Sequence, residues 1–317
     1  NEKGSRQICW LGKALVRRGC WDDFHRNLIS SGRLGRAVDC VTVRIDTRRS
    51  GLVKIAVSGK GGVGKTTVSA FLVRWFADQG KKVLAIDADP DANLGHALGI
   101  QDASDLTPIS QMKDLVAERT ESTPGSYGGF FKINPRVDDL PEKIAIPVGD
   151  RIRLMVMGGV KKGGSGCVCP ESILLKNLVQ HLILHRDEVV IMDMEAGIEH
   201  LGRGTSKSVD YLIAVVEPGR RSVETALRVK QLAADIGLDA ISFVGNKIRG
   251  QSDREFLIKS LPDFSFLGFV PYDDQIIEAD LRCAFPETMA SATRAALEEI
   301  ARNIVDGAAK PGSKSER

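Results

Sequence analysis

Short apolar runs alternate along this chain with longer segments whose composition and spacing favour helices. The apolar runs span residues 53–57, 82–86, 152–157, 189–192, 211–216, 240–244 and 267–270, and the helical segments span 68–79, 112–119, 171–186, 221–236 and 289–306. Near-continuous apolar runs of this length are typical of parallel strands that are buried on both faces. Strands that alternate with helices predict an α/β fold of three layers, with a mainly parallel central sheet flanked by helices.

A glycine-rich loop lies between the first predicted strand and the first predicted helix. It reads Gly59-Lys60-Gly61-Gly62-Val63-Gly64-Lys65-Thr66-Thr67, and we expect its residues to surround a bound nucleotide. The glycines allow backbone N–H groups to turn toward an anion, and the positive end of the following helix adds to the attraction. Lys65 can then reach the β- and γ-phosphates, and the Thr66 hydroxyl can bind Mg²⁺. Strand, loop and helix in this order predict a P-loop NTPase rather than a flexible glycine loop with a chance lysine.

Carboxylates follow two of the apolar runs. Asp87, Asp89 and Asp91 come after the second run, where the C-terminal ends of parallel strands face the ligand. We expect Asp87 to lie near the Mg²⁺ ion and this cluster to activate the attacking water. Asp91 is expected in a turn. The alternative is that the whole cluster is a solvated acidic turn.

Asp193 ends the run at 189–192 and precedes a glycine-containing turn, which is the Walker B arrangement, so we expect it to bind Mg²⁺ as well. The segment that follows, residues 198–205, is the predicted moving switch.

Two segments nearer the C-terminus are candidates for binding the base of the nucleotide. Asn246 and Lys247 follow the run at 240–244, and an Asn at this place can pair with the N6/N7 edge of adenine. Pro271 follows the run at 267–270, and the backbone there could pack against the base. We therefore expect Asn246, Lys247 and Pro271 at the nucleotide site.

A pair of cysteines is a candidate metal site. Cys167 and Cys169 stand just before the helix predicted at 171–186. A helix N-terminus and nearby lysines both favour thiolates, and residues two apart in an extended backbone point to the same side. The pair could therefore bind one soft or borderline metal ion. Two ligands do not complete a tetrahedral site, but a symmetric dimer would supply the other two; a pair of buried or idle thiols is the alternative.

Charge is distributed unevenly along the 317 residues. Residues 1–52 carry eleven lysines and arginines against five acids, and the remaining residues carry a net charge of −3. The body therefore gives no electrostatic case for binding nucleic acid, and no apolar run is long enough to cross a membrane. We expect a cytoplasmic protein whose six cysteines are thiols rather than disulfides.

Three regions are expected from these patterns. Residues 53–306 form a single ATPase domain, and residues 307–317 form a polar, disordered tail. Residues 1–52 show no clear periodicity, so we expect a poorly structured extension. We favour translated upstream sequence that is not part of the native protein, with a targeting or nucleic-acid-binding arm as the alternative.

The loop contains a lysine in addition to Lys65, because Lys60 directly follows the first glycine. This extra lysine resembles the signature of the deviant P-loop ATPases, the family of MinD, ParA and nitrogenase iron protein. The resemblance implies that ATP is hydrolysed in a homodimer, in which Lys60 crosses to the partner's nucleotide and adds to the charge stabilisation by Lys65. It also implies that Asp89, the second Asp of an Asp-x-Asp-Pro run, activates the attacking water.

A narrower resemblance covers about residues 53–282. The segments at 127–132, 166–170, 193–205 and 217–219 look like the CooC-type nickel-inserting ATPases, which mature carbon monoxide dehydrogenase. The resemblance implies that closure of the dimer on ATP and Mg²⁺ holds Ni²⁺ between Cys167, Cys169 and their partner copies. Hydrolysis would then release nickel to the nickel–iron–sulfur centre of carbon monoxide dehydrogenase as the client. A related protein that serves acetyl-CoA synthase shares most of these features, so both clients stay open.

Two other functions fit parts of the chain. A positioning switch of the MinD/ParA type would attach to a membrane or to DNA, but the body is not basic and the tail is not an amphipathic helix. An electron-transfer ATPase with an iron–sulfur cluster between subunits would need a further cysteine beyond the strand at 189–192, and residues 195–205 contain none.

Overall fold

The computed structural model describes residues 53–122, 130–158, 169–186, 188–196, 201, 209–238 and 241–307. Every described residue belongs to one compact unit, Arg48–Arg317. The expectations for residues 1–52 and for the tail beyond Gly307 therefore lie outside the described residues.

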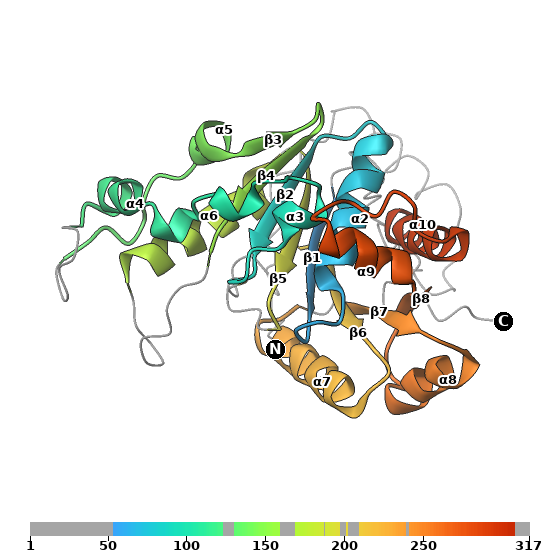
Figure 1. The fold of residues 1–317 in the computed structure, drawn as a ribbon. Helices are drawn as coiled ribbons and strands as arrows, with labels where there is room; N and C mark the ends of the chain where they lie inside the picture. The colour runs from blue at the N-terminus through green and yellow to red at the C-terminus, as the bar shows by residue number, and fades with distance from the viewer. Residues whose placement is uncertain are drawn as a thin grey trace, which may run out of the picture. The chain divides into compact units, whose positions relative to one another are not determined.

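One eight-stranded sheet forms the centre of the described unit (Figure 1), in the order β3-β4-β2-β5-β1-β6-β7-β8. The strands are β1 (Lys54–Gly59), β2 (Val83–Ala88), β3 (Ile146–Val148), β4 (Ile152–Val156), β5 (Val189–Met194), β6 (Tyr211–Val216), β7 (Ile241–Ile248) and β8 (Phe266–Pro271). All neighbours are parallel except β3 and β4 at one edge, which are antiparallel. The mainly parallel sheet predicted from the apolar runs is confirmed.

Helices follow most of the strands. They are α2 (Lys65–Asp78), α3 (Leu94–Ala97), α4 (Lys113–Thr120), α5 (Leu140–Ile144), α6 (Pro170–His185), α7 (Arg220–Asp235), α8 (Gln251–Ser260), α9 (Asp274–Leu281) and α10 (Ser291–Val305), with 3-10 turns at Ala103–Asp105 and Ile109–Gln111. No helix among the described residues is long and apolar enough to cross a membrane.

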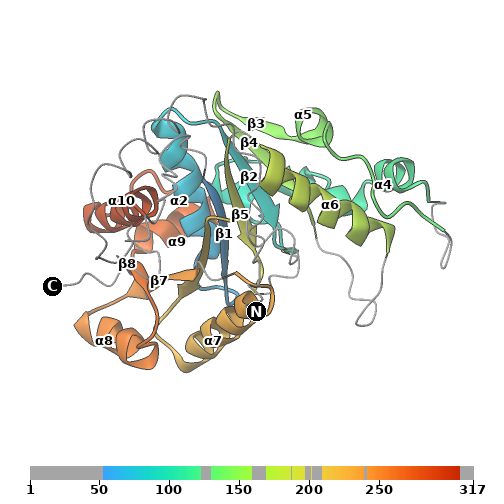
Figure 2. The same cartoon turned by 180° about the vertical axis from the view of Figure 1, so that it is seen from behind.

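The helices cover both faces of the sheet, as the two opposite views show (Figures 1 and 2). Val57 of β1 belongs to the core cluster that contains Leu72 of α2, and residues of α10 complete that side. The adjacent Ala56 belongs to the other cluster, with Leu178 of α6 and residues of α7. Successive strand residues thus point to opposite faces and are buried on both. This is the predicted three-layer arrangement.

The first residues of two helices are set by local backbone chemistry and differ from those that the apolar pattern predicts. α2 begins at Lys65 rather than at Val68, because Gly64, at φ +94°, turns the loop directly into the first helical turn. Pro170 is the first residue of α6, as its missing N–H group favours. The lysine and threonines of the loop therefore belong to the helix that the loop introduces.

The last strands depart further from the prediction. β7 extends to Ile248, so Asn246 and Lys247 lie inside a strand and not after it. The extension coincides with a bulge, since pairing with β8 shifts register between Gly245 and Ile248 and Lys247 has φ +57°. An apolar run does not predict such a bulge, because the residues in it are polar. Pro271 is likewise the last residue of β8.

Candidate functional site

The glycine-rich loop connects β1 to α2 at the C-terminal edge of the sheet. Gly59, Gly62 and Gly64 all have positive φ, at +150°, +78° and +94°. A Cβ atom added at Gly59 would lie 2.5 Å from the carbonyl oxygen of Val215 in β6, so only glycine fits against that neighbouring strand. The Val63 N–H group donates to the Lys60 carbonyl at 3.3 Å and closes the loop. The structure therefore has the strand, loop and helix that a phosphate cradle requires.

Two buried carboxylates lie beside this loop. Asp87 in β2 and Asp193 in β5 are direct register partners, and both are fully buried. Asp87 accepts hydrogen bonds from the backbone N–H groups of Leu94, at 2.7 Å, and Asp89, at 3.2 Å. Asp193 accepts one from the Ser69 hydroxyl at 3.2 Å, while its Oδ2 is buried with no hydrogen-bond partner among the described residues. A buried carboxylate oxygen left in this state favours a bound cation.

Burial changes the protonation of both carboxylates. Together with the charge of Asp193, burial raises the pKa of Asp87 to about 7, against the lowering effect of the backbone hydrogen bonds from Leu94 and Asp89. Burial raises the pKa of Asp193 to about 6, against the lowering effects of the Thr66 hydroxyl, the Lys65 charge and the Ser69 hydrogen bond. Asp87, Asp193 and Thr66 carry oxygen atoms of the kind that Mg²⁺ prefers, and Mg²⁺ binding by these residues stays a prediction.

The three lysines around the loop each face a carboxylate. Lys65 Nζ lies 3.4 Å from Asp89 Oδ2, and its side chain is 6 % exposed. Lys60 Nζ lies 3.8 Å from Glu217 Oε1, and Lys247 Nζ lies 3.4 Å from Glu217 Oε2. The structure therefore places Asp89 beside the loop that carries Lys60 and Lys65.

Two of the three residues predicted for the base, Asn246 and Lys247, contact the same loop. The Asn246 amide donates to the Val63 carbonyl at 2.7 Å, and the Lys247 ammonium donates to the Gly62 carbonyl. Asn246 is buried, at 7 % exposure, so its amide holds the loop by a buried hydrogen bond. Pro271 is the register partner of Ile248, at the end of the neighbouring strand β8.

One of the two predicted metal thiols is described. Cys169 is half-buried at the N-cap of α6, and its Sγ lies 3.1 Å from the Ser172 hydroxyl oxygen. Cys167 lies outside the described residues, as do residues 198–200 and 202–205 of the predicted switch. Within the described ranges, no group of three or more His, Cys, Asp and Glu side chains is placed to hold a metal ion.

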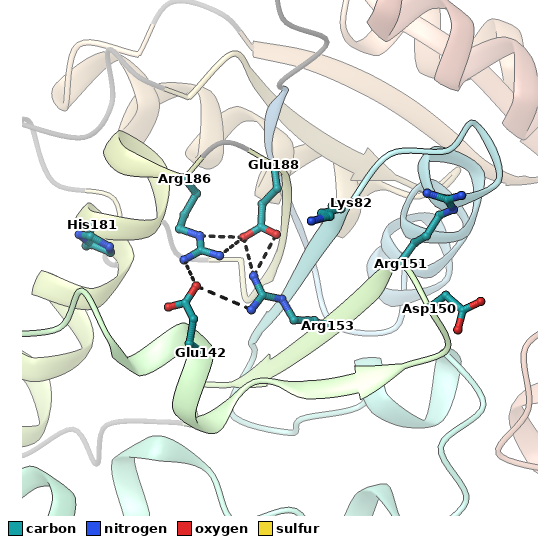
Figure 3. Close-up of a pocket in the computed structure, with 8 residues that line it drawn as sticks. All are labelled: Lys82, Glu142, Asp150, Arg151, Arg153, His181, Arg186 and Glu188. Atoms are coloured by element: carbon teal, nitrogen blue, oxygen red, sulfur yellow. Dashed lines mark hydrogen bonds and ion pairs between the residues drawn. The ribbon is translucent and has the colours of Figure 1, made fainter.

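A cavity of about 620 Å³ opens at the edge of the sheet opposite the P-loop (Figure 3). Its lining residues are Lys82, Glu142, Asp150, Arg151, Arg153, His181, Arg186 and Glu188. Figure 3 shows Glu188 between the guanidinium groups of Arg153 and Arg186, at 3.1 Å and 2.7 Å. Glu188 is 5 % exposed, so these ion pairs join the starts of β4 and β5 to the end of α6. The cavity is lined by a stabilising network, at the edge of the sheet opposite the P-loop.

A glycine cradle at a helix N-terminus, with buried carboxylates at the C-terminal edge of a parallel sheet, defines a P-loop nucleoside triphosphatase. Residues 54–284 match the family model described as the CobQ/CobB/MinD/ParA nucleotide binding domain. The chain belongs to this family, and it is an ATPase of the MinD/ParA/CooC type.

Individual relatives support this assignment. Two proteins are similar over 72 % of this chain: an uncharacterized ATP-binding protein of Methanocaldococcus jannaschii (48 % identity, 88 % of its length) and the carbon monoxide dehydrogenase accessory protein CooC of Rhodospirillum rubrum (47 % identity, 87 % of its length). The chain is thus a homologue of CooC. The septum site-determining protein MinD of Pyrococcus horikoshii, solved with Mg-ADP, shares the fold, with a TM-score of 0.57 at 23 % identity over 81 % of this chain and 98 % of that one.

Two residues at the site were missed by the sequence analysis. Ser69 holds Asp193, and its signal was its position one turn after the loop lysine on the same helix. Glu217 pairs with Lys60 of the loop and with Lys247 of β7, and its signal was an acid directly after a buried strand. Neither signal identifies a partner, because the partner depends on which strands are neighbours.

Proposed function

We propose that this protein is an ATP-driven nickel chaperone that acts as a homodimer and delivers nickel to the nickel–iron–sulfur centre of carbon monoxide dehydrogenase. The observation that carries the proposal is the 47 % identity to a carbon monoxide dehydrogenase accessory protein, over 87 % of that protein. We place the ATPase in a single domain at residues 53–306, with residues 1–52 and 307–317 outside it.

The nucleotide site has a role for each charged group around the loop. Thr66, Asp87 and Asp193 would hold Mg²⁺, which supplies positive charge beside the phosphates when it is bound. The loop N–H groups and Lys65 would bind the phosphates, and Asn246, Lys247 and Pro271 would border the base. Asp89 pairs with Lys65 at 3.4 Å. When the phosphate replaces Asp89 as the partner of Lys65, the Asp89 carboxylate would orient the attacking water. These assignments are supported by the convergence of the side chains at one edge of the sheet.

The cargo site is proposed at the dimer interface. Cys169 lies at the N-terminus of α6, where the helix dipole favours a thiolate, and Cys167 is two residues before it. Each subunit offers two thiols, and four thiolates make a tetrahedral site for Ni²⁺ or Zn²⁺. Lys60 would cross to the partner's nucleotide, so that ATP binding and closure of the metal site depend on the same interface.

Metal titration in the presence of ATP and Mg²⁺ tests this proposal. The wild-type protein should bind one nickel ion per two chains, and Cys167→Ala/Cys169→Ala should bind none at that site. Cys283→Ala is the matched control, because Cys283 is a half-buried free thiol on a different part of the fold. Equal nickel stoichiometry in wild type and in the double variant would refute the nickel site.

The client could instead be acetyl-CoA synthase. Carbon monoxide dehydrogenase is favoured because the accessory protein that resembles this chain is named for that enzyme. Incubation of the nickel-loaded protein with each nickel-free enzyme separates the two, since only the true client should regain activity at an accelerated rate.

A further inference from the structure

Glu217 faces both of the exposed lysines at the P-loop. Its Oε1 lies 3.8 Å from Lys60 Nζ, and its Oε2 lies 3.4 Å from Lys247 Nζ. Lys247 has a second contact, because its ammonium also donates to the Gly62 carbonyl. Lys60 has no other ion pair or hydrogen bond from its side chain among the described residues. The signature lysine is therefore held on its own subunit by a single carboxylate, which a second lysine shares.

The position of Glu217 follows from the sheet and not from a free loop. β6 is the parallel neighbour of β1, with Val215 opposite Gly59, so the chain leaves β6 beside the P-loop. The Glu217 N–H group donates to the Ser222 hydroxyl in α7 at 3.0 Å, which fixes the turn between strand and helix. The backbone thus presents the carboxylate to the loop before any nucleotide binds.

We propose that Glu217 is a positioning residue that retains Lys60 on its own subunit until a phosphate competes for it, and that keeps Lys247 in place after Lys60 moves to the partner's nucleotide. The inference rests on the proposed function, because the destination of Lys60 is the dimer. The side chains of Lys60 and Glu217 are 38 % and 27 % exposed, and exposed ion pairs hold only weakly. Glu217 therefore delays Lys60 without trapping it, since a multiply charged phosphate is the stronger partner.

The first test examines the nucleotide-free protein. Trace acetylation of lysines with acetic anhydride, read by mass spectrometry, reports how well each amine is shielded by its partner. In Glu217→Gln, labelling of Lys60 should rise about two- to five-fold. Glu224→Gln is the matched control, because Glu224 is an exposed acid on the adjoining α7, and it should leave Lys60 labelling unchanged. Equal labelling of Lys60 in Glu217→Gln and wild type would overturn the proposal.

The second test examines the transfer of Lys60. Light scattering at increasing ATP concentration, with Mg²⁺, gives the ATP concentration at which half of the chains are dimeric. Glu217→Gln should reach this point at about two- to five-fold less ATP than wild type or Glu224→Gln. An unchanged midpoint, despite raised Lys60 labelling, would show that Glu217 does not control the transfer. If the wild type forms no ATP-dependent dimer, the proposed function fails and the transfer with it, while the labelling still decides whether Glu217 holds Lys60.

Discussion

Asp87 and Asp193 are register partners on the adjacent strands β2 and β5, and both carboxylates are fully buried. Two buried acids in direct register repel each other unless a proton or a cation lies between them. One oxygen of Asp193 has no hydrogen-bond partner in the described part of the chain. We therefore expect the protonation of this pair to be linked to the Mg²⁺ binding that we propose for these residues.

This link predicts an unusual pH dependence of stability. The pKa of Asp87 is raised to about 7 and that of Asp193 to about 6, both from 3.8. The folded protein therefore binds more protons than the unfolded chain between about pH 4 and pH 7, and this contribution to stability is lost as pH rises through that window. For Asp87 the full shift corresponds to about 4 kcal/mol. Chemical denaturation of the nucleotide-free protein between pH 4 and pH 8 measures it.

Asp87→Asn isolates the contribution of this carboxyl. The variant loses a charge that titrates, so its free energy of unfolding should fall less steeply with pH than that of wild type. Asp91→Asn is the control, because Asp91 is exposed in the same turn and should keep the wild-type slope. Parallel curves for wild type and Asp87→Asn would show that the buried pair does not titrate in this range.

Asp89→Asn should separate binding of ATP from its hydrolysis. The amide can no longer orient and activate a water, so kcat should fall by about 100-fold or more. ATP affinity should stay the same or increase, because the 3.4 Å ion pair between Asp89 and Lys65 no longer competes with the phosphate. Steady-state hydrolysis and equilibrium titration measure the two effects. A loss of ATP affinity with unchanged kcat would assign Asp89 to binding instead.

Gly59→Ala should destabilise the nucleotide-free protein, whereas Gly61→Ala should be tolerated in it. A Cβ at Gly59 would lie 2.5 Å from the Val215 carbonyl, at a φ of +150°, while a Cβ at Gly61 would meet no atom within 4 Å. We expect Gly59→Ala to lower the free energy of unfolding by about 2 kcal/mol or more, and Gly61→Ala by under about 1 kcal/mol. Denaturant titration without nucleotide distinguishes them, and equal values would contradict the close approach of β1 and β6.

Glu188→Gln should reduce stability without changing ATP hydrolysis. Glu188 is 5 % exposed and pairs with Arg153 and Arg186, so its loss leaves two guanidinium groups poorly compensated. We expect a loss of about 2 kcal/mol. The more exposed Glu142 pairs with Arg186 too, and Glu142→Gln should cost under about 1 kcal/mol. A fall in kcat of Glu188→Gln at a temperature where it is folded would mean that this edge of the sheet influences the nucleotide site.

Much of this fold could be predicted from the sequence because its strands are apolar on both faces. The glycine loop could be predicted for a different reason, since few other sequences satisfy its backbone geometry. The antiparallel strand β3 and the helices α8 and α9 could not, because they are short and only partly buried. The register bulge around Lys247 could not be predicted either, because the residues that continue the apolar strand there are polar.

The residues of the candidate site could be proposed one by one from the sequence, but the contacts between them could not. Asp87, Asp193 and Lys65 follow from motifs, whereas the pairing of Lys60 with Glu217 depends on β6 lying beside β1. Strand order is a property of the whole sheet, and no local pattern encodes it. The proposed metal site depends in addition on a second chain.

The central claim, that ATP hydrolysis drives nickel delivery, is tested most directly by transfer of nickel to nickel-free carbon monoxide dehydrogenase. The nickel-loaded protein with ATP and Mg²⁺ should restore oxidation of carbon monoxide, measured as activity regained over time. A non-hydrolysable ATP analogue, and the variants Lys60→Ala and Cys167→Ala/Cys169→Ala, should each restore it no faster than free nickel does. Equal restoration by the wild type with and without hydrolysable ATP would contradict the claim.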